Sequence, residues 1–133
     1  MNTLLVVDAS SIVMLLTEPS TSAQQVADRV AGSQPHAPDH LPVEVTNVIR
    51  RYRKASLLTA TEARLTLDAF WAIPIELWPL EVLRERVWEL GDNLTAYDAA
   101  YVALAERLDA PLLTADARIA RAPGPRCVIE VAG

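Results

Sequence analysis

The 133-residue sequence has one cysteine, no long apolar run and no surplus of positive charge. Cys127 cannot form a disulfide within the chain, so we expect it to be a small core residue in a final strand, RCVIEV, of a cytoplasmic protein. Apolar stretches such as IVMLL are much shorter than the roughly 20 residues that a membrane helix needs. The opening LLVV ends at Asp8 with no basic residue before it, so neither a secretory signal nor a membrane association is predicted.

The net charge of −5 is the opposite of the basic surplus that nucleic-acid-binding proteins usually carry. Carboxylates that bind a metal ion would not repel the phosphates of a nucleic acid, however, because the ion makes the local field more positive. The acidity therefore weakens a nucleic-acid function without excluding it. The chain also lacks a glycine-rich phosphate loop and a G-x-S-x-G elbow, which leaves P-loop, Rossmann and serine-hydrolase functions unsupported.

Apolar residues make up 51% of the chain and charged residues 22%, a balance typical of a folded globular protein. No repeat, low-complexity tract or linker divides it, so one domain over residues 1–133 is predicted. The segment HAPDHLP is predicted as a short connection. Strands alternating with helices indicate an α/β protein, a three-layer α/β/α sandwich with a mostly parallel central sheet. Hydrophobic periodicity predicts strands at 3–7, 73–77, 111–114 and 126–131, and helices at 9–18, 20–31, 41–54, 59–71, 80–90, 94–108 and 117–122.

Four acidic residues occupy positions where an α/β protein binds ligands. Asp8 and Asp116 directly follow the apolar runs TLLVV and PLLT, at the carboxyl ends of predicted strands. Asp98 and Glu44 lie near the starts of helices, on or beside their apolar faces, where a carboxylate is costly unless it is compensated. Helix starts and strand ends lie on the same side of such a sheet, so the four acids are expected to converge. The apolar stripe around Asp98 consists of Leu94, Tyr97, Tyr101, Ala105 and Leu108.

Simple helix capping is the alternative for several of these residues. Thr95-x-x-Asp98 resembles a capping pair, and Asp116 has the position of an N-cap for a helix from residue 117. Ser10 is expected to cap the first helix or to orient water near Asp8. The same two alternatives, capping a helix or orienting water, apply to Thr114, a hydroxyl at a strand end near Asp116.

An all-carboxylate site without cysteine or a clear histidine favours a hard ion such as Mg²⁺, with Mn²⁺ as a substitute. Four converging carboxylates raise one another's pKa values unless a cation neutralises them. Such an ion activates water and stabilises charge on a phosphoryl group, so phosphodiester hydrolysis is the reaction this pattern favours. His36 and His40 lie among prolines in the predicted connection, and no catalytic role is predicted for either.

Two further groups of residues bear on nucleic-acid binding. The cationic end of the helix at 41–54 is most simply a solvated helix end, and contact with RNA phosphate is the alternative. The tryptophans at 71, 78 and 88 are predicted to be core or interface residues rather than a platform for stacking bases. The cationic cluster comprises Arg50, Arg51, Arg53 and Lys54.

Three stretches, LLVVDASSIV, LPVEVTNVIRR and LTAYDAAYVALAERLDAPLLTAD, resemble the PIN-domain ribonucleases, specifically the VapC-type toxins of bacterial toxin–antitoxin pairs. The resemblance covers essentially the whole length and implies Mg²⁺-dependent endonucleolytic cleavage of RNA. It implies that Asp8 and Asp98 are the principal metal ligands, that Glu44 completes the acidic pocket, and that Asp116 binds through water or at a second metal. It also implies a homodimer that is neutralised by a cognate antitoxin protein.

Three other kinds of protein are alternatives to this hypothesis. A PIN-like module that binds RNA or protein without cutting would be indicated by a missing acid, and none is missing here. A haloacid-dehalogenase-like phosphatase would have Asp-x-Asp after the first strand, where this chain has Asp8-Ala9-Ser10. A receiver domain would have a lysine near the C-terminal strand, where this chain has none.

Overall fold

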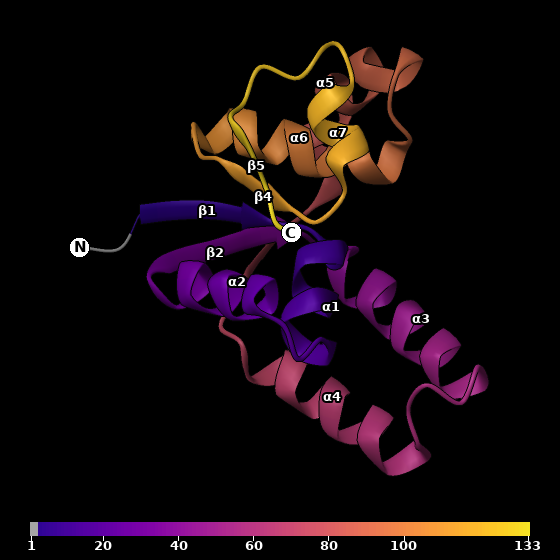
Figure 1. Cartoon of the computed structure of the whole chain (residues 1–133). Helices are drawn as coiled ribbons and strands as arrows, with labels where there is room; N and C mark the ends of the chain where they lie inside the picture. The colour runs from indigo at the N-terminus through magenta and orange to yellow at the C-terminus, as the bar shows by residue number, and fades with distance from the viewer. Residues whose placement is uncertain (1–2) are drawn as a thin grey trace.

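A computed structural model describes residues 3–133, which form a five-stranded sheet with helices on both faces (Figure 1). The order in the sheet is β3-β2-β1-β4-β5, and all neighbouring strands in the described residues are parallel. The predicted α/β/α sandwich is therefore confirmed. The strands are β1 (Thr3–Val7), β2 (Ser33–Pro38), β3 (Glu76–Trp78), β4 (Leu112–Thr114) and β5 (Ile129–Val131).

The helices divide into two layers, with α1 to α4 on one face of the sheet and α5 to α7 on the other (Figure 1). No helix within residues 3–133 combines the length and the apolar character needed to cross a membrane. The helices are α1 (Ala9–Thr17), α2 (Thr21–Ala31), α3 (Leu41–Lys54), α4 (Ala60–Ala72), α5 (Arg84–Glu89), α6 (Ala96–Leu108) and α7 (Ala117–Arg121).

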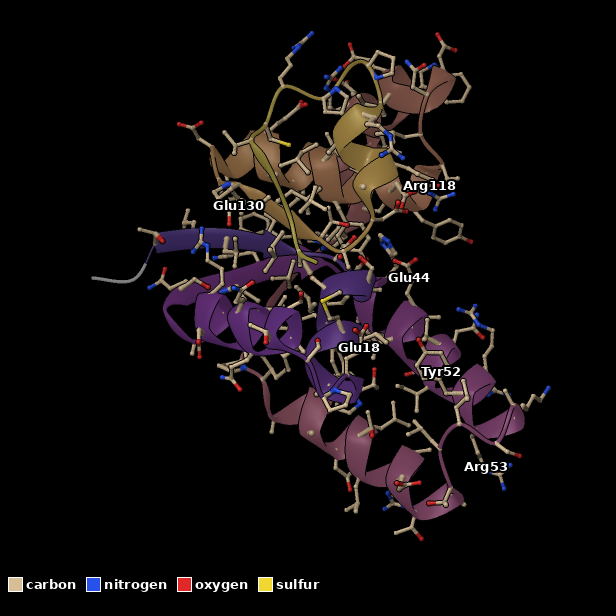
Figure 2. The ribbon with its side chains drawn as sticks, viewed as in Figure 1. Glu18, Glu44, Tyr52, Arg53, Arg118 and Glu130 are labelled. Carbon is tan, nitrogen blue, oxygen red and sulfur yellow. The ribbon has the colours of Figure 1, made fainter. Side chains whose placement is uncertain are left out.

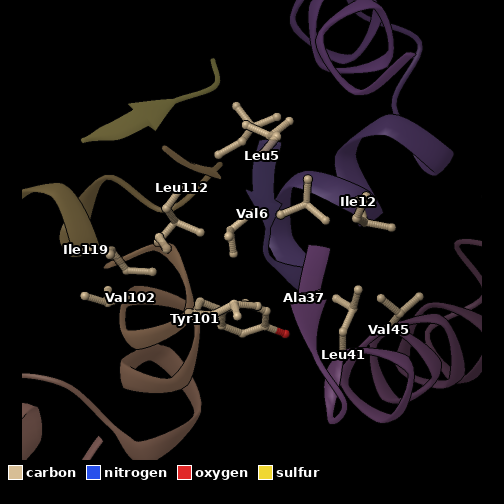
Figure 3. Packing of buried hydrophobic residues seen from close by; sticks show 14 of the residues in the cluster. Leu5, Val6, Ile12, Ala37, Leu41, Val45, Tyr101, Val102, Leu112 and Ile119 are labelled. Carbon is tan, nitrogen blue, oxygen red and sulfur yellow. The ribbon is translucent and has the colours of Figure 1, made fainter. Parts of the chain in front are cut away.

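The core lies along β1 and α6. Leu5, Val6 and Val7 of β1 are fully buried, as an apolar strand covered on both faces should be. In α6 every residue from Ala99 to Ala105 is buried, so the buried surface is wider than the single stripe predicted from sequence. Figure 3 shows Tyr101 and Val102 of α6 packed among side chains of the sheet and of α3. Tyr97 does not belong to this core, because it is 62% exposed.

One predicted connection is a strand. The segment HAPDHLP overlaps β2, which pairs with β1 through Pro35 and with β3 through Pro38. Proline lacks a donor for the ladder, so both prolines locally disfavour a strand here. His36 is consequently a buried strand residue, and its Nδ1 accepts a hydrogen bond from Trp78 Nε1 at 2.9 Å.

The region before α6 also differs from the prediction. The helix expected at 80–90 is α5 flanked by two short 3₁₀ helices, Leu80–Leu83 and Leu90–Asp92, and the strand expected at 73–77 lies at Glu76–Trp78. The hydrophobic period of a short apolar segment fits either a helix or a strand, so it does not locate the element. Pairing with β2 decides the position of β3.

Two expectations about burial need correction. Cys127 lies before β5 rather than in it and is only half-buried against the core, where burial raises the pKa of its thiol to about 11. Trp71 and Trp88 are 64% and 87% exposed, so neither is a core residue, and only the interface alternative of the prediction remains for both. Both lie on helix faces that are not covered by the rest of the chain in residues 3–133.

Candidate functional site

The four acids lie at strand ends and helix starts, as predicted from their positions. Asp8 and Asp116 follow β1 and β4, which are adjacent in the sheet, while Glu44 and Asp98 lie in the first turns of α3 and α6. Burial raises the pKa of Asp98, and the charges of Asp116 and Glu44 raise it further. These three carboxylates are therefore close enough to repel one another. Figure 2 shows Glu44 of α3 and Arg118 of α7 on the same side of the molecule.

Asp8 is the most deeply buried of the four, at 5% exposure. Its carboxylate caps α1 by accepting from the Ser11 backbone N–H at 2.9 Å, and it also accepts from Ser10 Oγ at 2.8 Å and Thr114 Oγ1 at 2.5 Å. Burial raises the pKa of Asp8, and these hydrogen bonds oppose the rise. The residue is thus both a helix cap and a carboxylate fixed in one orientation.

Ser10 and Thr114 support Asp8 directly. Ser10 does not cap α1, because Asp8 holds that position, so the capping interpretation of Ser10 is wrong. Its hydroxyl lies 3.2 Å from Thr114 Oγ1 and accepts a hydrogen bond from the Ala115 N–H at 2.9 Å. Thr114 also accepts from the Asp116 N–H at 3.0 Å. The two hydroxyls therefore link the ends of β1 and β4.

Glu44 is held by two aromatic residues that the sequence analysis did not assign to the site. The Tyr101 hydroxyl donates to Glu44 Oε1 at 2.5 Å, and His40 Nε2 lies 3.1 Å from the same oxygen. The His40 contact has ion-pair distance but not the alignment of a hydrogen bond. Burial alone would raise the pKa of Glu44, but the contacts with His40 and Tyr101 outweigh it, so that the pKa is lowered.

Asp98 and Asp116 border a small cavity of about 270 Å³, which Arg118 also lines. The Thr95 hydroxyl accepts from the Asp98 N–H at 3.2 Å, so Thr95 supplies the cap of α6, as predicted, and the Asp98 carboxylate remains beside the cavity. Asp116 caps α7 and also accepts from the Arg118 guanidinium at 3.0 and 2.7 Å. The Arg118 hydrogen bonds are the main reason why the pKa of Asp116 is lowered.

The four acids lie near one another, but their side chains are not arranged to bind a metal ion as they stand. In residues 3–133, no three histidine, cysteine, aspartate or glutamate side chains are grouped so that they could hold an ion as they stand. Asp8 is engaged by hydroxyls, Glu44 by Tyr101, and Asp116 by Arg118. The oxygen-only donors and the mutual repulsion at Asp98 nevertheless suit a hard divalent cation.

Three residues near the acids carried little sequence signal. His40 and Glu44 are spaced i, i+4 across a helix start, and this spacing was the one available indication of their contact. Tyr101 was assigned to an apolar stripe, and its hydroxyl contact with α3 depends on tertiary packing. Arg118 follows Asp116 by two residues, and nothing in the sequence shows that it folds back onto the carboxylate.

The predicted cationic cluster lies at the C-terminal end of α3, and all four side chains are exposed. Their exposure agrees with a solvated helix end, and contact with RNA phosphate stays a prediction. Arg50 also lines a cavity next to Glu44.

Comparison with known proteins places the chain in a family. The family model of the PIN domain matches residues 5–125. Ribonuclease VapC12 of Mycobacterium tuberculosis is 39% identical over 129 residues, which are 96% of this chain and 98% of that protein. Ribonuclease VapC1 of the same organism is 39% identical over 127 residues, which are 95% of this chain and 96% of that protein.

A solved structure shares the fold of the chain. The crystal structure of VapBC2 from Rickettsia felis, bound to a DNA fragment from its promoter, has a TM-score of 0.69 at 13% identity. The match covers 98% of this chain and 100% of that chain, and at this identity it shows a shared fold. The chain therefore belongs to the PIN-domain family and, within it, to the VapC ribonucleases.

Proposed function

We propose that the protein is a divalent-metal-dependent endoribonuclease, the toxin of a toxin–antitoxin pair, formed as one PIN-like domain over residues 1–133. The observation that carries the proposal is the placement of four carboxylates at the ends of the adjacent strands β1 and β4 and in the first turns of α3 and α6. The raised pKa of Asp98, caused by burial and by the charges of Asp116 and Glu44, supports a need for a cation there. Relatives that match nearly the whole chain and bear the name ribonuclease support RNA as the substrate.

The ion is proposed to be Mg²⁺, with Mn²⁺ as a substitute, held by Asp8 and Asp98 as principal ligands. Glu44 completes the acidic pocket directly or by ordering water, and Asp116 binds through water or at a second metal. When bound, the ion supplies activation of water and stabilisation of charge on the phosphoryl group. Its charge also offsets the burial and repulsion that raise the pKa of Asp98.

The protein's own residues set the positions of these carboxylates. Thr114 and Ser10 hold the Asp8 carboxylate in one orientation, and the Tyr101 hydroxyl does the same for Glu44. Arg118 neutralises Asp116, so its guanidinium would compete with an ion for direct binding to that carboxylate. Once released, the exposed guanidinium is available to a substrate phosphate.

The partners are proposed from the family. The protein is expected to act in the cytoplasm on RNA, to form a homodimer and to be neutralised by a cognate antitoxin protein. The name of the solved VapBC2 assembly supports a protein partner for a chain of this fold.

A second candidate is a PIN-like module that binds RNA or protein without cutting. One observation favours it, namely that three of the four acids are engaged by protein groups and no ion cage is assembled in residues 3–133. All four acids are nevertheless present and neighbouring, which favours the enzyme.

The deciding experiment is a cleavage assay on total bacterial RNA with Mg²⁺ or with EDTA. It compares the parent protein with Asp8→Asn and Asp98→Asn, and with Asp92→Asn as a matched control that removes an exposed carboxylate outside the site. Discrete fragments are expected only from the parent and the control, and only with Mg²⁺. Full cleavage by both site variants, or equal cleavage in EDTA, would reject the proposal, and binding without fragments would favour the non-cleaving module.

A further inference from the structure

A second, larger cavity borders the acidic residues and is lined by exposed aromatic side chains. Its volume of about 720 Å³ falls within the range of small-ligand sites. Trp71 at the end of α4, Tyr97 at the start of α6 and Val43 on α3 line it, and these side chains are 64%, 62% and 71% exposed. Large apolar side chains that remain exposed around one cavity indicate a binding surface.

Both aromatic rings are anchored on one edge. The Trp71 ring meets the ring of the buried Phe70 at a centroid distance of 5.2 Å and an interplanar angle of 68°. The Tyr97 ring meets His40 at 5.7 Å and 66°. Because these contacts restrict the rings while more than half of each side chain stays exposed, little conformational freedom is lost when a flat ligand stacks on them.

The α3 side of the cavity is apolar at Pro42 and Val43 and carries one cation, Arg50, and one anion, Glu44. Val43, Asn47, Arg50 and Lys54 are all exposed and lie on one face of α3 at helical spacing. Asn47 and Arg50 line the cavity, and Lys54 continues the same face beyond it. This face combines a hydrogen-bonding amide with a guanidinium, the group that best matches a phosphate.

The cavity borders the acidic site through Glu44. Glu44 lines it, and the same carboxylate accepts the hydrogen bond from Tyr101 and acts on Asp98. Tyr97 directly precedes Asp98 in the first turn of α6. A ligand whose flat part stacks on Trp71 and Tyr97 therefore lies in the same cavity as Arg50 and Glu44 of α3.

We propose that Trp71, Tyr97 and Arg50 form a subsite for one nucleotide of single-stranded RNA next to the phosphodiester that is cut. The inference rests on the proposed function and adds the position of the substrate. A nucleotide satisfies both parts of the cavity, since its base stacks on the rings and its phosphate pairs with Arg50. An apolar peptide segment would instead cover Arg50 without satisfying its charge, which is costly.

The test measures binding separately from cleavage. A fluorescently labelled single-stranded RNA of mixed sequence is titrated with protein, with Ca²⁺ in place of Mg²⁺, and anisotropy is recorded. The variants are Trp71→Ala, Trp71→Phe and Tyr97→Leu, and Trp88→Ala serves as the matched control because Trp88 is an exposed tryptophan outside this cavity. A second RNA carries abasic positions in place of its bases.

The stacking contribution of one ring predicts about a tenfold loss of affinity in Trp71→Ala, a smaller loss in Trp71→Phe and none in Trp88→Ala. The loss should vanish on the abasic RNA, because the partner of the ring is then missing. Thermal melting checks folding, and Trp71→Phe keeps the ring contact with Phe70.

Several results would overturn the subsite. These are unchanged affinity in Trp71→Ala, an equal loss in Trp88→Ala, an equal loss on abasic RNA, or no binding by the parent protein. A switch from dimer to monomer in Trp71→Ala at unchanged RNA affinity would assign the cavity to a second copy of the chain instead. If the parent binds RNA through Trp71 but does not cut with Mg²⁺, the subsite stands and the proposed ribonuclease function fails.

Discussion

The Thr114 hydroxyl donates a hydrogen bond to Asp8 Oδ2 at 2.5 Å, although 106 positions separate the two residues in the chain. Thr114 is fully buried at the end of β4, and Asp8 follows β1, its neighbour in the sheet. The same hydroxyl accepts from the backbone of Asp116. One side chain therefore fixes the orientation of one acid and the backbone position of another.

Thr114→Val keeps the shape of this side chain and removes its hydroxyl. Since the buried Asp8 carboxylate then loses a donor, we expect a loss of about 1–3 kcal/mol in the free energy of unfolding and reduced cleavage. Thr114→Ser should retain most of both. Urea denaturation and the cleavage assay measure the two effects, and a valine variant as stable and active as the parent would contradict the role given to Thr114.

Asp98→Asn should stabilise the metal-free protein while it abolishes cleavage. Burial and the charges of Asp116 and Glu44 raise the pKa of Asp98, so the charged form is disfavoured in the folded state. This penalty is absent below the usual pKa of 3.8 and grows as the pH rises from there to the folded-state pKa.

In EDTA, the melting temperature of Asp98→Asn should therefore exceed that of the parent at neutral pH, and the difference should shrink below about pH 3.8. Asp92→Asn, an exposed control, should melt like the parent at both pH values. An Asp98→Asn variant that is less stable than the parent at neutral pH would show that Asp98 is not repelled by its neighbours.

Mg²⁺ should raise the melting temperature of the parent and not that of Asp98→Asn. An ion that binds only the folded state adds about 2.7 kcal/mol of stability at a hundredfold excess over its Kd. Arg118→Ala should need less Mg²⁺ for the same shift, because Asp116 is no longer paired with a guanidinium. Calorimetry with EDTA reversal measures this, and equal shifts in the parent and Asp98→Asn would locate the ion elsewhere.

Glu106→Gln should lower stability at neutral pH by about 1–3 kcal/mol. Glu106 on α6 accepts from Arg86 Nε at 2.7 Å and from the Arg126 N–H at 2.8 Å. Burial alone would raise the pKa of Glu106, but these contacts outweigh it and hold the pKa below 4.5.

A lowered pKa means that this stabilisation is complete above pH 4.5 and is lost as the pH falls through the folded-state pKa. The difference between the parent and Glu106→Gln should therefore narrow on acidification, as measured by urea denaturation across pH. A difference that stays constant down to pH 3 would contradict the assignment.

Reversal of Arg50 and Lys54 to glutamate should weaken RNA binding and flatten its dependence on salt. Each phosphate contact that is lost removes about one unit from the slope of log K against log salt concentration. The control is the double reversal of Arg84 and Arg107, which are exposed on the other helical layer. An unchanged slope would leave the α3 cations as a solvated helix end only.

The sequence by itself determined the α/β class and most element positions, because hydrophobic period and capping residues are local. Thr59 and Glu62, three residues apart, form a capping box at the start of α4, and the continuous apolar run of β1 forms the buried strand that it predicts. The sequence also identifies the four candidate site acids, because each follows a strand or begins a helix. These are Asp8, Glu44, Asp98 and Asp116. The ends of strands and helices are set by residues close by in the sequence, so the positions of these acids relative to them can be predicted.

Only the tertiary structure decided what each acid contacts and which apolar residues are buried. Pairing with β1 and β3 made the proline-containing segment 33–38 a strand, against its local preference. Contacts of Tyr101 with Glu44 and of Thr114 with Asp8 join residues that lie far apart in sequence. Trp71 and Tyr97 have the apolar character of core residues, yet they remain exposed because no other element covers them in residues 3–133. Hydrophobicity sets the tendency of a side chain to be buried, whereas the packing of the helical layers decides which side chains are covered.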